Sequence, residues 1–284
     1  MDRRVLPLAL VAALLVACGR DGGPAEQAAA GEPGVVHVHG LGINPKDGAL
    51  FAATHTGLFR IGEDGHAERV AARYQDTMGF TVVGADHFLS SGHPGVREYL
   101  DDKLPPLLGL RETRDAGRSW KSISLLGDAD FHILVSAHGK VYGYDSSSSA
   151  LMVSEDRKRW DSRSKIELED FAVSPFDPNK ILATSRSSLL ESLDGGRTWS
   201  RLSAPPLLLL EWQDEAGLWG LAPDGSVQRS EDSGRSWQSP GTLNGPPEAF
   251  LAVSGALYAA VEEDGLYVSR DGGISWSVVY REHG

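Results

Sequence analysis

The chain has 284 residues, of which 39 are acidic and 27 are basic, so its formal net charge is −12. A surface with this charge repels phosphate backbones and anionic headgroups, which excludes nucleic acid and anionic lipid as expected partners and leaves cations, neutral ligands such as carbohydrate, and proteins. Cys18 is the single cysteine, so no disulfide can form within the chain.

Residues 1–18 have the pattern of a bacterial export signal. Two arginines near the start precede an apolar run, residues 6–16, which is too short to span a bilayer as a stable helix. The next residues, Leu15-Val16-Ala17-Cys18, resemble the bacterial lipobox, which implies cleavage before Cys18 and attachment of lipid to its sulfur. We therefore expect a lipid-anchored, extracytoplasmic protein of the cell envelope, at the outer membrane if the host has one. An ordinary secretory signal with an incidental cysteine is the alternative.

Residues 19–34 are rich in Gly, Ala, Glu and Gln without an apolar period, and they predict a flexible tether. The folded domain is predicted over residues 35–284. Short apolar runs there, such as residues 80–83, 131–135 and 250–253, are separated by Gly, Pro, Asp and Ser. This pattern is typical of β-strands, and no segment has a sustained helical period. The sequence therefore predicts an all-β domain.

One eight-residue motif, Ser/Thr-x-Asp-x-Gly-x-x-Trp, recurs along the domain. Complete copies begin at residues 113, 192, 230 and 269, and a copy at residue 154 is one residue short and lacks the glycine. The spacing is that of a four-stranded blade of a β-propeller. Six blades, starting near residues 35, 76, 129, 168, 206 and 248, account for the domain if the first blade has lost its motif. Because the interval before the first copy is long, a seven-bladed ring is the alternative.

The motif residues are predicted to build a hairpin turn. Short polar side chains accept hydrogen bonds from nearby N–H groups, the glycine adopts a backbone angle that other residues resist, and the tryptophan packs between blades. These structural residues are Asp115, Trp120, Asp194, Trp199, Asp232, Trp237, Asp271 and Trp276.

The motif resembles the Asp-box, or bacterial neuraminidase repeat, of sialidases, sortilin-type receptors and photosystem II assembly-factor propellers. Similar lipoproteins carry a general glycosyl-hydrolase label. In those families the box is a structural turn on the face away from the binding site. The resemblance therefore implies a propeller whose ligand site lies on the opposite face, here called the upper face, which carries the second-to-third-strand loops and the entries into each first strand.

Histidines gather on this upper face in the first two blades. His37 and His39 enter the first strand of blade 1 and, being two apart on a strand, should project to one side. His55 and His93 end the second strands of blades 1 and 2, and Met78 enters blade 2. Imidazoles suit zinc, and imidazoles with a thioether suit copper. We therefore predict one metal site from these five residues. The alternative is that the histidines only bond to backbone groups or end strands.

The loop of residues 94–109 is the longest on the upper face and follows His93. An insertion of this length is either a lid, a docking arm for a partner envelope protein, or a plain surface loop.

Sialidase chemistry needs an arginine triad, a tyrosine nucleophile with an acidic partner, and an acid/base. Candidates are Arg97, Arg111, Arg186, Tyr144 and Asp145, with the upper-face acids Glu169, Asp170, Glu248, Glu262 and Glu263, but the sequence does not assemble them into a set. No Ser-His-Asp spacing, phosphate loop or nucleotide fingerprint is present. The predicted function is binding of a transition metal, copper or zinc, or of an envelope protein. A sialidase-like glycoside hydrolase is the alternative, and a non-enzymatic role is favoured.

Overall fold

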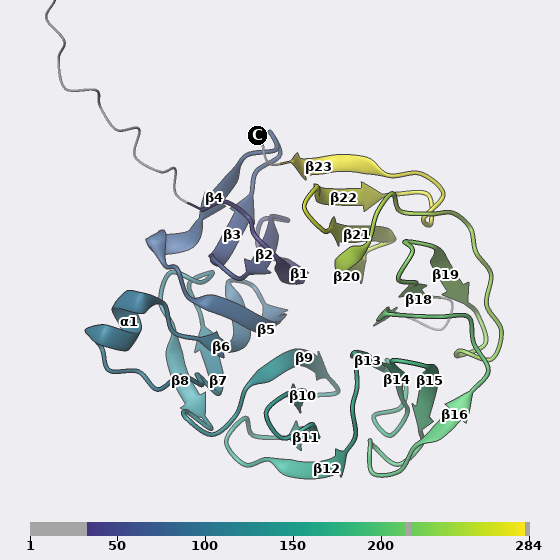
Figure 1. The fold of residues 1–284 in the computed structure, drawn as a ribbon, viewed down its shortest axis with the longest axis horizontal. Helices are drawn as coiled ribbons and strands as arrows, with labels where there is room; N and C mark the ends of the chain where they lie inside the picture. Colours follow the sequence, from purple (N-terminus) through teal and green to yellow (C-terminus); the bar gives the residue numbers. More distant parts are fainter. Residues whose placement is uncertain (1–32, 214–216, 282–284) are drawn as a thin grey trace, which may run out of the picture. The chain divides into compact units, whose positions relative to one another are not determined.

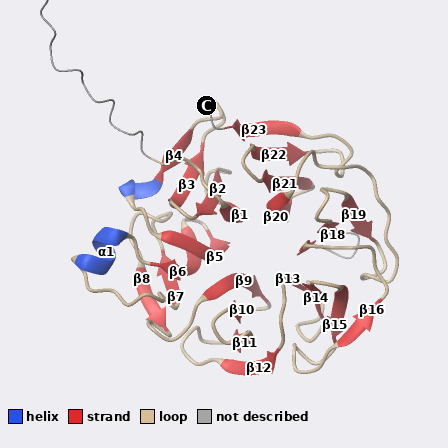
Figure 2. Ribbon diagram, viewed as in Figure 1, coloured by secondary structure: helices blue, strands red, loops and turns tan. Residues whose placement is uncertain are grey.

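The computed structural model describes residues 33–213 and 217–281. They form six antiparallel sheets arranged in a ring, which confirms the six-bladed β-propeller (Figure 1). Helical structure in this part of the chain is confined to α1 (Val96–Leu100) and the 3₁₀ turn η1 (Val70–Ala72) (Figure 2). The predicted signal peptide with Cys18, and residues 19–32 of the predicted tether, lie outside the described residues.

Blade 1 contains β1 (Val38–Ile43), β2 (Leu50–Thr54), β3 (Gly57–Ile61) and β4 (Ala67–Arg69). Blade 2 contains β5 (Asp76–Gly84), β6 (His87–His93), β7 (Leu110–Thr113) and β8 (Lys121–Ser124). Blade 3 contains β9 (Phe131–Ala137), β10 (Lys140–Asp145), β11 (Ala150–Ser154) and β12 (Asp161–Lys165). Blade 4 contains β13 (Asp170–Val173), β14 (Ile181–Ser185), β15 (Ser188–Ser192) and β16 (Ser200–Leu202). Blade 5 contains β17 (Leu209–Trp212), β18 (Leu218–Leu221) and β19 (Val227–Ser230). Blade 6 contains β20 (Pro247–Val253), β21 (Ala256–Val261), β22 (Gly265–Ser269) and β23 (Ser277–Arg281).

Within each blade the strands pair in chain order, and the first strand lies innermost in the ring (Figure 1). In blade 5 two isolated bridges, Ser226 with Thr242 and Arg229 with Gln238, stand in place of a fourth strand. Each described sheet is built from consecutive strands of one blade, so blades 6 and 1 share no strand. Side-chain packing joins these two blades. Glu248 adds a polar link at this seam, because its Oε2 accepts a hydrogen bond from Val38 N–H at 2.9 Å.

In blades 2, 3, 4 and 6 the Asp-boxes connect third and fourth strands, as predicted, and in blade 5 the box follows the third strand. In the blade 4 box, Ser192 Oγ accepts a hydrogen bond from Gly196 N–H at 2.8 Å and donates to Asp194 Oδ1 at 2.8 Å. Asp194 then accepts from the backbone and the hydroxyl of Thr198. These donors hold the pKa of Asp194 well below its usual range. The carboxylate is therefore committed to the turn and not free for chemistry.

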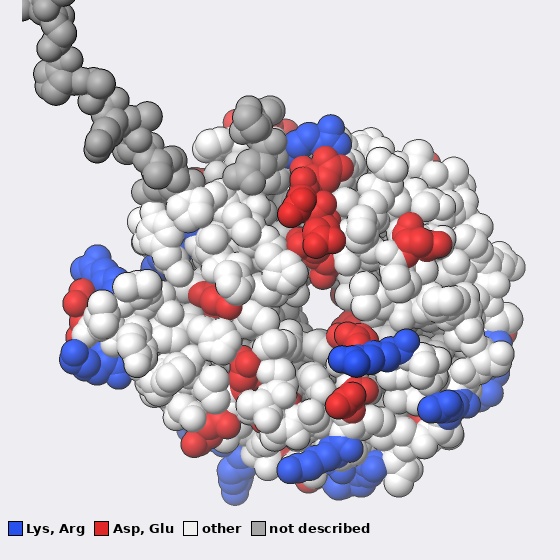
Figure 3. Space-filling view, in the orientation of Figure 1, with Lys and Arg blue, Asp and Glu red and all other residues white. Residues whose placement is uncertain are grey.

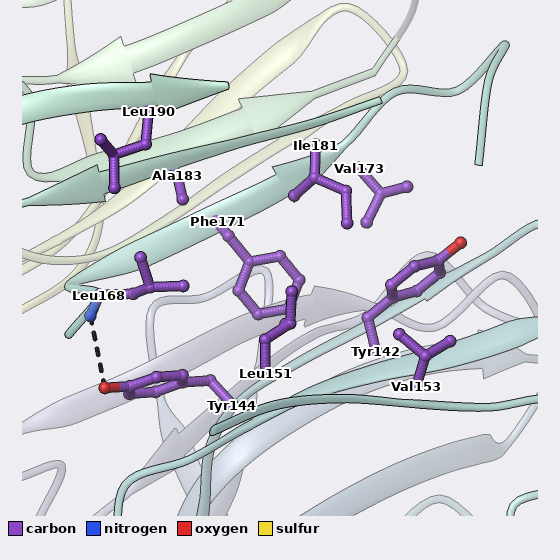
Figure 4. Packing of buried hydrophobic residues seen from close by; sticks show 10 residues of the cluster. All are labelled: Tyr142, Tyr144, Leu151, Val153, Leu168, Phe171, Val173, Ile181, Ala183 and Leu190. Atoms are coloured by element: carbon purple, nitrogen blue, oxygen red, sulfur yellow. Dashed lines mark hydrogen bonds between the residues drawn. The ribbon is translucent and has the colours of Figure 1, made fainter. Parts of the chain in front are cut away.

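Each complete box also packs on the preceding blade. Gly196 has φ +87°, and a Cβ placed there would lie 2.3 Å from Cδ2 of Leu151 in blade 3, so both its backbone angle and its contact require glycine. Trp199 donates from its indole nitrogen to Ser164 Oγ of blade 3 at 3.0 Å and packs on the core between blades 3 and 4. Figure 4 shows the buried residues of that core. In the short blade 3 box, Arg157 adopts φ +61° without glycine.

Among the residues that the structure describes, no helix has the length and apolar character needed to cross a membrane.

Candidate metal centre

The first strands of all six blades line a central cavity of about 860 Å³. In Figure 3 a band of acidic side chains runs outward from the central opening between blades 1 and 6, and further acidic side chains together with a basic one lie beside the opening on the opposite side. A smaller cleft of about 360 Å³ lies at that seam and is lined by Glu248, Glu262, Glu263 and Asp264. The surroundings of the channel therefore favour cations.

Two of the predicted histidines meet at a carboxylate that starts blade 2. His39 Nε2 lies 3.2 Å from Asp76 Oδ1, and His55 Nδ1 lies 3.3 Å from Asp76 Oδ2. One ligand atom from each of these residues lies within 4.8 Å of the others. His39 Nε2 and Asp76 Oδ1 are buried, and neither has a hydrogen-bond partner in the described part of the chain. We call His39, His55 and Asp76 the Asp76 cluster.

His37 lies beside this cluster, but not for the reason expected from the sequence. β1 begins at Val38, His37 precedes it with φ +48°, and a bulge between Val38 and Gly40 holds His39. Strand alternation therefore does not apply. The two rings still meet, with centroids 4.7 Å apart, while His37 Nδ1 lies 2.7 Å from Glu248 Oε1.

His93 belongs to a different group. Its ligand atom lies within 4.8 Å of those of Asp130 and His132, which we call the Asp130 cluster. His55 and His93 do occupy matching blade positions, but each meets the carboxylate at the start of the following blade. Equal positions therefore place His55 and His93 in two separate clusters one blade apart, where the sequence predicted a single site. Met78 lines the central channel, and its role as a ligand stays a prediction.

Asp76 and Asp130 are the residues that sequence reasoning missed. A signal for them was present, because acids recur at or beside the starts of the first strands, at Asp76, Asp130, Asp170 and Glu248. Asp170 in blade 4 and Glu248 in blade 6 accept hydrogen bonds from backbone N–H groups instead. Asp170 Oδ2 accepts a hydrogen bond from Leu210 N–H at 2.7 Å. Desolvation of the carboxylate by the surrounding protein nevertheless raises the pKa of Asp170 to about 7. Burial, with the charge of Asp170 nearby, also raises the pKa of Glu211 well above its usual value.

The residues considered for sialidase chemistry do not form an arginine triad facing a tyrosine. Arg97 lies 3.8 Å from Asp101, Arg111 donates to Gln75 at 2.7 Å, and Arg186 lies 3.8 Å from Glu169. Tyr144 is buried in the core between blades 3 and 4, where its hydroxyl accepts from Leu168 N–H at 3.3 Å (Figure 4).

The model of the BNR/Asp-box repeat matches residues 267–278, which contain the whole of the last box, residues 269–276. No curated protein matches the chain. Among solved structures, the Niastella koreensis GH74 enzyme shares 15% identity with a TM-score of 0.55; the alignment covers 87% of this chain but only 37% of that enzyme. YCF48 bound to D1 peptide shares 16% identity over 87% of this chain and 82% of its own, with a TM-score of 0.54. A chain of the nidogen/laminin complex shares 12% identity over 78% of this chain and 88% of its own, with a TM-score of 0.59.

At these identities the likeness extends to the fold alone. The repeat match and the ring of six blades agree with each other. The chain is a six-bladed β-propeller of the BNR/Asp-box type.

Proposed function

We propose that this protein binds a divalent transition-metal ion, zinc or copper(II), through the Asp76 cluster on its upper face. The observation that carries the proposal is the pair formed by His39 Nε2 and Asp76 Oδ1, which are buried 3.2 Å apart without a hydrogen bond. A buried carboxylate oxygen that faces an imidazole nitrogen and accepts no hydrogen bond is costly unless a cation neutralises it.

The spacing of the ligand atoms also supports a tetrahedral ion. Two ligands that each lie about 2.0–2.1 Å from such an ion are about 3.3–3.4 Å apart. The distances from Asp76 to His39 and His55 are 3.2 and 3.3 Å, and they end on different oxygens of the carboxylate. One ligand atom of each residue lies within 4.8 Å of the others, so side-chain movement would have to bring the three ligand atoms around one ion.

The donor set narrows the choice of metal. Imidazole and carboxylate suit zinc and copper(II), whereas copper(I) prefers sulfur ligands. Three protein ligands leave a fourth position for water or for another side chain. His37 is the candidate for that position, since its ring touches that of His39 and the hydrogen bond with Glu248 uses only its Nδ1.

The test is a zinc titration of protein purified without a histidine tag and freed of metal by a chelator. Calorimetry should show an equivalent of zinc whose binding disappears in Asp76→Asn and in the double variant His39→Ala, His55→Ala. His66→Ala, which removes an exposed histidine from a turn in the same blade, is the matched control and should bind as the unaltered protein does. If well-folded Asp76→Asn protein binds zinc with unchanged stoichiometry and affinity, the proposal is wrong.

We also propose that the residue 94–109 arm docks a protein partner in the envelope, where a lipid on Cys18 would hold the propeller. The supporting observation is one apolar face of α1, where Val96, Tyr99 and Leu100 are 78, 52 and 56% exposed. Residues three and four apart share a helix face, so the three side chains form one patch. The solved neighbours include a propeller with a bound peptide and a nidogen/laminin complex, which fits binding of protein on this fold.

Photo-crosslinking in cells tests the docking proposal. A photoreactive residue at Tyr99 should trap a specific protein, and Val96→Asp with Leu100→Asp should prevent this. The same residue placed at Leu193, an exposed position in a box turn on the opposite face, should not trap it. Equal products from both positions would contradict the proposal.

A further inference from the structure

The Asp130 cluster lies at the junction of blades 2 and 3 and shares no residue with the Asp76 cluster. His93 ends β6, Asp130 directly precedes β9, and His132 lies on β9. One ligand atom of each lies within 4.8 Å of the others. The side chain of Asp130 is only 10% exposed, whereas those of His93 and His132 are 37 and 40% exposed. A buried carboxylate is thus flanked by two imidazoles that solvent can reach.

The arm orients the His93 ring. His93 Nδ1 lies 2.9 Å from the carbonyl oxygen of Pro106, and because a carbonyl can only accept, Nδ1 carries the proton. In the neutral ring the lone pair is then on Nε2, which faces Asp130 Oδ1 at 3.7 Å. This arrangement, with one nitrogen bonded to a backbone carbonyl and the other left to coordinate, is typical of histidines that bind metals.

Ser146 and His132 hold the second oxygen of the Asp130 carboxylate. Asp130 Oδ2 accepts from Ser146 Oγ at 2.8 Å and lies 2.9 Å from His132 Nε2. Asp130 Oδ1, by contrast, is buried and has no hydrogen-bond partner among the described residues. An acceptor without a donor therefore points toward the His93 nitrogen that carries a lone pair, and a cation between them would satisfy both.

We propose that His93, Asp130 and His132 form a second, independent site for a divalent transition-metal ion, with zinc as the expected occupant. Two imidazoles and a carboxylate are suitable zinc ligands, and three protein ligands leave one coordination position open. His132 binds through Nε2 once the ring is in the tautomer that carries its proton on Nδ1. A neutral imidazole changes tautomer without net loss of a proton, so its Nε2 lone pair becomes available to zinc.

Zinc titration of tag-free, metal-free protein tests this site separately from the Asp76 cluster. The unaltered protein should bind two zinc ions, His93→Gln should lose one, Asp76→Asn should lose the other, and the double variant should bind neither. His66→Ala should keep both. Ser146→Ala, which removes only the support of Asp130, should weaken the second site by roughly 10–100-fold without changing the first.

Thermal melting must first show that each variant is folded, and His132→Ala provides a second route if His93→Gln is not. Two zinc ions retained by folded His93→Gln and His132→Ala proteins would overturn the second site. A single zinc ion lost in Asp76→Asn but kept in His93→Gln would also overturn it, while leaving the proposed function intact. The opposite pattern would support this site and contradict the proposed function.

Discussion

Acidic side chains near the starts of the first strands differ in the hydrogen-bond donors that surround them. Asp170 and Glu248 accept hydrogen bonds from backbone N–H groups of the next blade. Asp76 and Asp130 face imidazoles, as Glu248 also faces His37, but only these two aspartates keep a buried oxygen without a donor among the four acids. A carboxylate oxygen in that state loses its solvation without compensation. The difference between the two pairs is the reason for assigning cations to the second pair.

Asp170 should make the stability of the propeller depend on pH. Its pKa is raised from 3.8 to about 7, so the folded state holds the proton more tightly than the unfolded chain does. The resulting stability is fully present below about pH 4 and is lost as pH rises through about 7, by no more than about 4 kcal/mol. Asp170→Asn should flatten this part of the profile in urea unfolding. Glu169→Gln, an exposed neighbour, should retain the slope, and an equal slope in Asp170→Asn would contradict the assignment.

The positions of the histidines could be predicted from the sequence in part. The predicted starts of the blades place them together in blades 1 and 2. Their division into two clusters could not be predicted, because it depends on a bulge at His39 and on the direction in which His55 and His93 turn toward the next blade. Local backbone irregularities of this kind leave no periodic trace in a sequence.

The blades themselves were largely predictable, because each box marks the connection from a third to a fourth strand. Blade 1 was recoverable without a box only because the other five set its length. Helix α1 was not predicted, since its 5 residues are too few to establish a helical period. The arm that contains it appeared in the sequence as an insertion without assigned structure.

The box tryptophans should contribute to stability by joining blades. Trp199 is half-buried against the blade 3–blade 4 core and bonded to Ser164. Trp199→Ala should lower the free energy of unfolding by about 2–3 kcal/mol, somewhat less than the roughly 3–5 kcal/mol typical of fully buried aromatic residues. Denaturant unfolding measures the change. Leu193→Ala, an exposed position in the same box, should have little effect, and equal losses in both variants would refute the inter-blade role.

The ring as a whole presents an acidic upper region around its channel, which suits capture of cations in the extracytoplasmic space proposed for it. Because the described sheets share no strand between blades, the seam between blades 6 and 1 depends on apolar packing and on Glu248. The same Glu248 binds His37, so closure of the ring and the position of the first histidine are connected.

The lipid proposed at Cys18 should attach the protein to the membrane. Cys18→Ser should move the protein from the membrane fraction to the soluble fraction without changing its melting temperature. Fractionation followed by immunoblotting measures this, with Ser185→Ala on β14 as a fold control that should stay at the membrane. Retention of Cys18→Ser in the membrane fraction would contradict lipid anchoring.

The glycoside hydrolase alternative has its own test. Because the three arginines have separate partners and Tyr144 is buried, we expect no turnover of an activated sialoside by the purified propeller. Hydrolysis that disappears in Arg186→Ala and in Tyr144→Phe would reverse the order of the two functions. A characterised sialidase in the same assay controls for substrate quality.

The central claim is that the upper face holds a metal ion at the Asp76 cluster, and anomalous diffraction at the zinc edge tests it most directly. Crystals of tag-free protein grown with one to two equivalents of zinc should give an anomalous peak about 2 Å from His39 Nε2, His55 Nδ1 and a carboxylate oxygen of Asp76. The peak should be absent from Asp76→Asn crystals grown in the same way. A zinc-loaded crystal without a peak at these three side chains would contradict the account.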